Sequence, residues 1–220
     1  MPNMKKPSKS DTVGRLYGGE TSEDRTQRRK AQFLDAGLQL FGTVGYKAAS
    51  VRALCREAKL TDRYFYESFK SVEDVLVAVY EREIQRLVAA VLQAVPSISS
   101  QERIADMARP ALQAFFKGVQ DPVVAKTIWF EVLGVSDRVN RVYQSTIHDI
   151  GDLLLQMVKN YFPDLCMNRQ RETLLSIGIV GAISQSTMAW IISGFNASID
   201  DLVEVNLLLL EGLGLRLKSN

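Results

Sequence analysis

Residues 60–76 read LTDRYFYESFKSVEDVL, and this stretch decides the fold of the chain. Within six positions it contains four aromatic side chains: Tyr64, Phe65, Tyr66 and Phe69. On a short helix over residues 62–68, the two phenylalanines share one face, while Arg63 and the tyrosines occupy the other face and its flank. A core helix would not carry adjacent charged residues, and a purely solvated helix would not carry four rings. We therefore expect one face to anchor this helix in a core and the other face to bind a partner.

The segments around this stretch also have helical patterns. Apolar residues at three- and four-residue spacing predict a helix over residues 24–44. Ser50 is a favourable N-cap for a short helix over residues 50–58, and Ser71 opens a long helix over residues 71–95. Two short helices joined by a tight turn and supported by a longer first helix are the layout of a helix–turn–helix DNA-binding motif.

Charge is distributed unevenly along the chain. The whole sequence has a net charge of +2, but residues 1–70 hold 14 Lys/Arg against 8 Asp/Glu, and residues 71–220 hold 13 against 17. The first part is therefore basic, with a net +6, and the second is acidic, with a net −4. This asymmetry indicates that the first part meets a polyanion.

The composition excludes several classes of protein. Hydrophobic residues make up 46% and charged residues 24%, as in globular proteins, and no uninterrupted apolar run approaches the roughly 18 residues of a membrane span. No apolar run follows the N-terminal lysines, so no secretory signal is predicted. Cys55 and Cys166 lie far apart, and His148 is the only histidine. We therefore expect reduced thiols in the cytoplasm, no zinc site and no cofactor.

The remainder of the chain is predicted to be helical, which makes the fold class all-α. The expected helices cover residues 101–118, 122–134, 137–161, 168–194 and 199–217. Pro110 is expected to kink or divide the first of them, and the pair Asp121-Pro122 to start the second. The predicted organisation is a disordered basic tail over 1–22, a helix–turn–helix domain over 23–70, and a larger helical domain over 71–220.

DNA contacts can be assigned on the motif. Its second helix enters the major groove, where Arg63 can pair with guanine and tyrosine hydroxyls can donate to phosphates. Helix N-termini at Ser50 and Thr61 attract phosphate, and a basic arm over residues 25–30 adjoins the motif. The predicted DNA-binding residues are Lys47, Ser50, Arg52, Thr61, Asp62, Arg63, Tyr64, Tyr66 and Lys70.

Residues 28–81, RRKAQFLDAGLQLFGTVGYKAASVRALCREAKLTDRYFYESFKSVEDVLVAVYE, resemble the TetR family of one-component transcriptional repressors. Residues 66–69, Tyr-Glu-Ser-Phe, match the Tyr-x-x-Phe pattern that ends the family's recognition helix. Residues 73–76, Glu-Asp-Val-Leu, match the start of the helix that follows. The resemblance implies that Tyr66 is the phosphate-binding tyrosine of the motif.

Two positions depart from the family pattern. Val72 stands where a lysine that contacts phosphate is common, and Lys70 is the nearest cation that could replace it. Tyr64 stands where a small residue is common, so the bases that are read are expected to differ. The Val72 departure leaves open whether DNA affinity is lowered.

The resemblance also implies the role of the C-terminal part, which in the family forms a dimer and binds a small effector. The segments over 168–194 and 199–217 are apolar and contain small residues, so two copies of each are expected to form a four-helix interface in a homodimer. The predicted effector-binding residues are Met107, Phe115, Trp129, Phe130, Glu131, Tyr143, Met188 and Trp190, with Met157 as a further wall residue. Their apolar and aromatic character favours a hydrophobic or amphipathic effector.

These observations predict a regulator rather than an enzyme. The expected function is a repressor that binds a palindromic double-stranded DNA operator and is released by a hydrophobic small molecule. Two alternatives stay open, namely a regulator or activator without a small-molecule effector, and an all-α interaction protein that has lost DNA binding. The effector, the operator and the regulated genes are not encoded in any pattern of the sequence.

Overall fold

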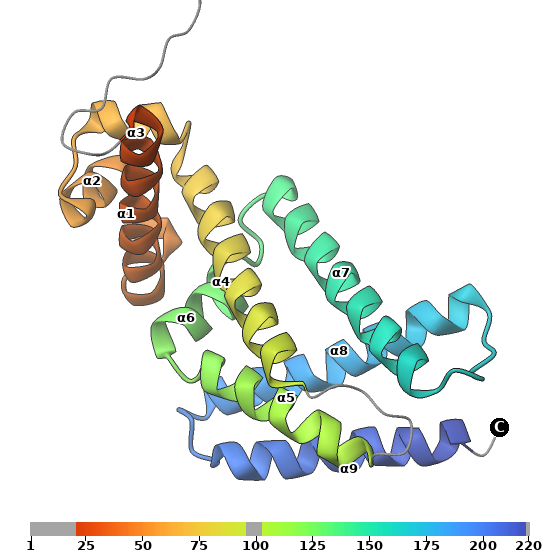
Figure 1. The fold of residues 1–220 in the computed structure, drawn as a ribbon. Coiled ribbons are helices and arrows are strands. Elements are labelled where there is room, and N and C mark those ends of the chain that lie inside the picture. Colours follow the sequence, from red (N-terminus) through yellow and green to blue (C-terminus); the bar gives the residue numbers. More distant parts are fainter. Residues whose placement is uncertain (1–20, 96–102, 219–220) are drawn as a thin grey trace, which may run out of the picture.

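The structure of the chain is a computed structural model that describes residues 21–95 and 103–218 (Figure 1). These residues form helices and no strand, which confirms the all-α prediction. The elements are α1 (Ser22–Thr43), η1 (Tyr46–Ala48), α2 (Val51–Ala58), α3 (Asp62–Ser68), α4 (Val72–Ala94), α5 (Ile104–Val119), α6 (Pro122–Lys126), η2 (Thr127–Glu131), α7 (Asp137–Tyr161), α8 (Arg169–Ile192) and α9 (Ile199–Lys218). Most of the predicted tail, residues 1–20, lies outside the described residues.

Side-chain caps set the starts of the N-terminal helices. A reciprocal capping box between Thr21 and Asp24 begins α1, two residues before the predicted start. Ser50 and Ser71 cap α2 and α4 as predicted. Thr61 precedes α3 but makes no side-chain cap bond; its carbonyl oxygen accepts the Tyr64 and Phe65 amides instead.

The aromatic face of α3 forms part of a shared core. The ring of Phe33 meets the rings of Phe65 and Phe69 edge to face, with the Phe33 and Phe65 centroids 5.5 Å apart. Phe65 is fully buried, whereas Tyr66 beside it is 63% exposed. The core continues from α1–α3 into α4 and into the α6–η2 segment, where Trp129 packs at its edge. The helix–turn–helix is therefore anchored directly on the rest of the molecule.

The C-terminal helices are arranged around the far half of α4. In Figure 1, α1–α3 gather at one end of α4, and α5, α8 and α9 lie near its other end. Helix α5 packs between α4 and α9, while α7 packs on α8. Helix α7 begins beside the start of α4 and diverges from it (Figure 1). A pocket is lined by side chains from both of these helices.

The structure excludes a division of the helix at Pro110 and a single α-helix over residues 122–134. Pro110 does not divide α5, which runs unbroken through it while packed on both sides. The segment 122–134 is not one α-helix, because α6 gives way to a π-helical turn, η2. The Thr127 hydroxyl donates to the Val123 carbonyl oxygen at 2.8 Å, a back-bond that is known to distort helices.

Within residues 21–95 and 103–218, one helix combines the length and apolar character of a membrane span. In α8, an 18-residue window has a mean hydropathy of 1.5, and 22% of that window is buried. Its exposed residues recur on one face: Leu174, Gly178, Gly181, Ala182, Gln185, Ala189 and Ile192. A one-sided stripe rich in small residues is typical of a helix that packs closely against another protein surface.

The contact between α1 and α6 gives a first prediction. A Cβ added at Gly42 would lie 2.5 Å from the Val123 carbonyl oxygen and 2.7 Å from its Cα. Backbone atoms cannot rotate away, so we expect Gly42→Ala to lower the free energy of unfolding by about 1–3 kcal/mol. Urea denaturation measures this loss, and an unchanged midpoint and slope would contradict the contact.

Candidate functional site

The outer face of α3 carries a set of paired polar residues. Arg63 is 84% exposed on its side chain and bonds to Glu67 through Nε at 3.0 Å. Arg29, from the predicted basic arm, also pairs with Glu67 at 3.3 Å and lies 3.9 Å above the ring of Tyr64. The arm therefore holds the helix in place from α1, and Tyr64 is half-buried beneath it. Tyr66 has no such cover.

The other predicted DNA contacts lie on η1, at the start of α2 and at both ends of α3. All are exposed: Lys47, Ser50, Arg52, Thr61, Asp62 and Lys70. The hydroxyl oxygen of Ser50 accepts a hydrogen bond from the Ala53 amide, and the hydroxyl can still donate its own proton to a phosphate. Val72, which stands where a lysine is common, packs against the core. The nearby exposed cation at the start of α4 is therefore Lys70. The structure thus places the nine predicted residues on and around the α2–α3 unit.

The two cysteines give a prediction about pH. Burial and a hydrogen bond with Asp62 raise the pKa of the Cys55 thiol to about 11, whereas Cys166 is exposed. At pH 8 we expect a thiol-specific reagent to label one cysteine in the native protein, Cys166, and both after unfolding. Mass spectrometry of the labelled peptides identifies the site. Fast labelling of native Cys55 at pH 8 would contradict its buried, protonated state.

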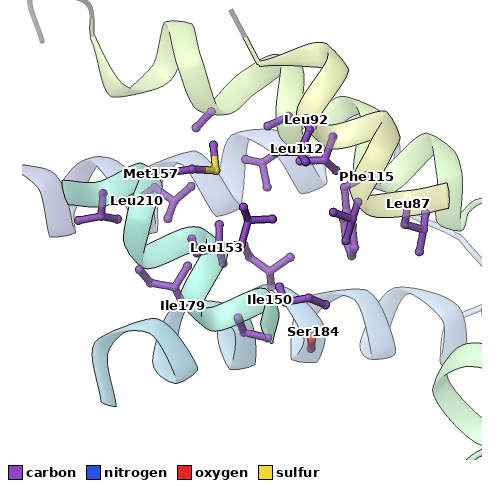
Figure 2. Close-up of a pocket in the computed structure, with 18 of the residues that line it drawn as sticks. Leu87, Leu92, Leu112, Phe115, Ile150, Leu153, Met157, Ile179, Ser184 and Leu210 are labelled. Carbon is purple, nitrogen blue, oxygen red and sulfur yellow. The ribbon is translucent and has the colours of Figure 1, made fainter. Parts of the chain in front are cut away.

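A pocket of about 250 Å³ lies among α4, α5, α7, α8 and α9, with Ile128 and Trp129 at the edge of the α1–α4 core (Figure 2). None of the described residues that line it carries a charge. Among the described lining residues, the polar side-chain groups are the Ser184 hydroxyl, three tyrosine hydroxyls and the indole N–H of Trp129. Such a wall suits an apolar group and offers no opposite charge to a buried ion.

The pocket contains half of the predicted effector-binding residues. Met107, Phe115, Trp129 and Tyr143 line it, as does Met157. Phe130, Glu131, Met188 and Trp190 are not among its lining residues. Trp190 packs against Phe116 in a second core, and its indole N–H donates to the Ala197 carbonyl oxygen at 2.9 Å. It therefore serves the packing of α8.

Two of the predicted residues that do not line the pocket lie on η2. Phe130 is 37% exposed and does not line the pocket, unlike its neighbours Ile128 and Trp129. The carboxylate of Glu131 accepts a hydrogen bond from the Tyr46 amide at 2.6 Å. An apolar sequence context suggested a ligand contact for Glu131, but its actual partner is the backbone of η1.

The aliphatic part of the pocket wall was not predicted from the sequence. Figure 2 shows the labelled residues Leu87, Leu92, Leu112, Ile150, Leu153, Ile179 and Leu210 around the pocket. On the sequence these residues are indistinguishable from ordinary core positions, because they share the same apolar faces of the same helices. Only the divergence of α7 from α4 reveals that they surround a space.

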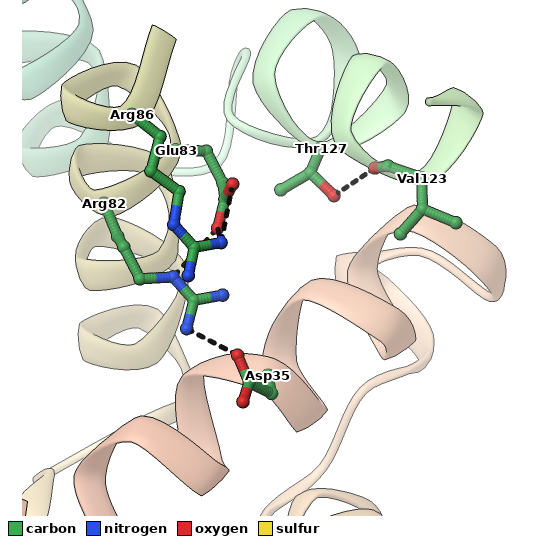
Figure 3. A network of polar contacts seen from close by, with 6 residues as sticks. All are labelled: Asp35, Arg82, Glu83, Arg86, Val123 and Thr127. Carbon is green, nitrogen blue, oxygen red and sulfur yellow. Dashed lines mark hydrogen bonds and ion pairs between the residues drawn. The ribbon is translucent and has the colours of Figure 1, made fainter. Parts of the chain in front are cut away.

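A charged network joins α4 to α1 near η2 (Figure 3). Glu83 is 4% exposed and lies between Arg82 and Arg86, whose nitrogens are 2.8 and 3.1 Å from its Oε1. Arg82 also reaches Asp35 on α1 at 2.7 Å. A buried carboxylate needs such partners, and here they fix α1 on α4.

A second ionic contact ties α7 to the junction of α3 and α4. Arg138, in the first turn of α7, bonds to Asp74 at 2.6 Å and to Glu73 at 3.2 Å. The other oxygen of Asp74 accepts from the Lys70 amide at 3.1 Å, rather than completing a capping box with Ser71. Burial acts to raise the pKa of Asp74, but the bonds from Arg138 and Ser71 outweigh it, and the pKa is lowered.

Comparison with known proteins gives consistent matches. Residues 33–79 match the sequence profile of a family described as bacterial regulatory proteins, tetR family. The chain is 24% identical over 181 residues to the HTH-type transcriptional activator FasR of Mycolicibacterium smegmatis, with 80% of each chain covered.

Two solved structures illustrate the shared fold. One is the fatty acid degradation regulator FadR from Bacillus halodurans, with a TM-score of 0.71, 19% identity, and 84% of this chain and 95% of the other covered. The second is FadR from Bacillus subtilis in complex with stearoyl-CoA, with a TM-score of 0.66, 15% identity, and 82% and 96% covered. At these identities the likeness concerns the fold.

Proposed function

Since this chain belongs to the TetR family of bacterial transcription regulators, we propose that it binds an operator as a homodimer and responds to a long-chain fatty acyl ligand. The family and the curated relative are regulators of transcription, so the chain is not an enzyme, as predicted. Because a bacterial transcription regulator binds DNA in the cytoplasm, the proposed location of this protein is cytoplasmic. We also propose two domains: residues 23–70 bind DNA, and residues 71–220 bind the ligand.

The DNA-binding proposal rests on the exposed face of α3. Arg63 and Tyr66 project from it, and Lys47, Arg52 and Lys70 add positive charge around it. Their exposure leaves them available to base edges and phosphates, whereas the aromatic face of the same helix is occupied by the core.

The uncharged pocket wall carries the ligand proposal. A free carboxylate would lose its hydration there without gaining an oppositely charged partner, whereas an acyl chain would lose only water contacts. An acyl thioester, whose charged head group stays outside, therefore fits better than a fatty acid. From Tyr80 to Leu92 the wall follows α4 for roughly 18 Å at about 1.5 Å per residue, the scale of a long acyl chain. The FadR structure with stearoyl-CoA supports the same ligand class.

The homodimer proposal rests on α8 and α9. The exposed small residues of α8 continue into exposed apolar residues on α9, which are Val205, Leu208, Leu209 and Leu215. Nothing lies within 4 Å of a Cβ added at Gly178, Gly181 or Gly212, so another helix could approach these positions closely. A bond between Ser186 and Asn206 fixes the two helices relative to each other. Two copies of this surface would form a four-helix interface.

Gly181→Arg tests this interface. The side chain would point into open space in one protomer and, across a two-fold axis, into its partner. We expect the variant to sediment as a folded monomer under conditions in which the wild type sediments as a dimer. A dimeric variant, or a monomeric wild type at micromolar concentration, would contradict the assignment.

The sign of regulation has two candidate forms. The predicted repressor would leave DNA when the ligand binds. The match to the activator FasR favours a second candidate, in which the protein raises transcription from its operator. A reporter placed behind the operator, with and without the gene for this protein, distinguishes the two, since deletion raises expression for a repressor and lowers it for an activator.

Thermal unfolding with a series of acyl-CoA compounds tests the proposed ligand. We expect stearoyl-CoA and palmitoyl-CoA to raise the melting temperature at micromolar concentration, and acetyl-CoA and free CoA to leave it unchanged, because a ligand of the native state stabilises it by mass action. Equal stabilisation by free CoA, or none by any long-chain thioester, would refute the assignment of the pocket.

A further inference from the structure

The pocket wall and the helix–turn–helix share one short segment, α6–η2. Ile128 and Trp129 line the pocket from this segment. Glu131, at its end, accepts the Tyr46 amide at 2.6 Å. Lys126, at its start, donates through Nζ to the Thr43 carbonyl oxygen at 2.9 Å and lies 3.7 Å from Glu131. The segment therefore contacts the ligand space on one side and the α1–η1 junction on the other.

The contact with Glu131 is specific. Its carboxylate is largely buried, with 17% of the side chain exposed. It meets the chain at Gly45, whose φ of 92° is a conformation that favours glycine. A Cβ at Gly45 would lie 3.2 Å from a Glu131 oxygen, so the absence of a side chain admits the carboxylate. The Tyr46 amide begins η1, the segment that leads directly into α2.

The π-helical geometry of η2 offers a route to a second conformation. A π-helical turn contains one residue more than an α-helical turn, and such turns are frequent at functional sites. If the turn relaxes to α-helical geometry, its last residues rotate by up to about 100° relative to the residues before the turn, since one α-helical turn has 3.6 residues. Such a rotation would carry Glu131 away from the Tyr46 amide.

We propose that Glu131 is the positioning residue that transmits occupancy of the pocket to the helix–turn–helix. A ligand pressing on Trp129 shifts η2, and Glu131 then releases the Tyr46 amide and frees the α1–α2 junction. The inference rests on the proposed acyl ligand. It assigns to Glu131 a role in coupling and none in contact with the ligand, because Glu131 lies outside the pocket wall.

Amide hydrogen exchange in the wild-type protein tests the release directly. We expect stearoyl-CoA to speed exchange of the Tyr46 amide by at least about tenfold, since opening of this bond sets its protection. The Leu54 amide, bonded to the Ser50 carbonyl oxygen inside α2, serves as the internal reference and should keep its protection. Unchanged protection of Tyr46 under conditions in which stearoyl-CoA alters DNA binding would overturn the inference.

Glu131→Ala tests the coupling, with Glu172→Ala as its matched control. Glu172 is a similarly covered acid, 14% exposed, that pairs with Lys159 at 2.8 Å between α7 and α8. Glu131→Ala should bind stearoyl-CoA within about threefold of the wild type, while the ligand's effect on DNA affinity falls from the typical 5–150-fold range to less than about threefold. Glu172→Ala should retain the wild-type effect. Full coupling in a folded Glu131→Ala variant would overturn the inference.

Two measurements distinguish a failure of this inference from a failure of the proposed function. Circular dichroism reports whether Glu131→Ala folds, and the exchange experiment needs no variant. A wild-type protein whose DNA affinity ignores stearoyl-CoA would refute the proposed function, and the inference with it. A wild type that responds, beside a variant that responds equally, would refute the inference alone.

Discussion

Replacing Phe65 with alanine is expected to lower the free energy of unfolding by about 3–5 kcal/mol. The ring is fully buried and meets Phe33, Phe69 and the flank of Tyr66 at centroid distances of 5.3–6.1 Å. Its removal leaves a cavity between α1 and α3 that a seven-residue helix cannot close by itself. Urea denaturation followed by circular dichroism measures the loss.

Tyr66→Ala is the matched contrast on the same helix. Tyr66 is 63% exposed, so we expect its loss to change the unfolding free energy by less than about 1 kcal/mol. Affinity for operator DNA should instead fall by about tenfold or more, if the ring and hydroxyl contact sugar and phosphate. Large destabilisation by Tyr66→Ala, or none by Phe65→Ala, would mean that the two faces of α3 are assigned the wrong way round.

Ala111→Trp is expected to abolish binding of long-chain acyl-CoA. Ala111 lines the pocket from α5, and an indole there would occupy much of the roughly 250 Å³ available. Affinity for stearoyl-CoA should fall at least about a hundredfold, which corresponds to about 2.8 kcal/mol. Isothermal titration calorimetry measures this change, and DNA binding should persist at ligand concentrations that alter it in the wild type.

Lys117→Trp provides the control for this substitution. It places the same side chain on the same helix at an exposed position that does not line the pocket. The control should bind stearoyl-CoA as the wild type does. If both variants lose binding equally, the effect comes from the stability of α5 and the pocket assignment fails; if neither loses it, the ligand binds elsewhere.

The local part of the fold could be predicted from the sequence. Helix α3 spans Asp62–Ser68 as expected, because its boundaries depend on a nearby turn and on aromatic spacing within a few residues. The caps at Ser50 and Ser71 are likewise interactions between neighbours along the chain. Such features are encoded within single segments, so periodicity and capping preferences are sufficient to find them.

The rest depends on partners distant in sequence. Glu131 meets an amide 85 positions away, and no pattern around either residue announces that contact. Trp190 was predicted to bind the effector because aromatic residues suit pockets, but its indole is engaged by Ala197 and by a second core. The π-helical turn was also missed, because the apolar pattern over 122–134 is compatible with a continuous α-helix. These outcomes arise from tertiary packing, which a one-dimensional pattern does not specify.

The most direct measurement is the affinity of the dimer for labelled DNA from upstream of its own gene, by fluorescence anisotropy, as stearoyl-CoA is added. Excess unrelated DNA and free CoA serve as controls. The account predicts saturable, sequence-specific binding that stearoyl-CoA changes by about fivefold or more, with no effect of CoA alone. Specific binding that no long-chain acyl-CoA alters would contradict the account. Equally strong binding to unrelated DNA would show that the protein does not recognise this sequence as an operator.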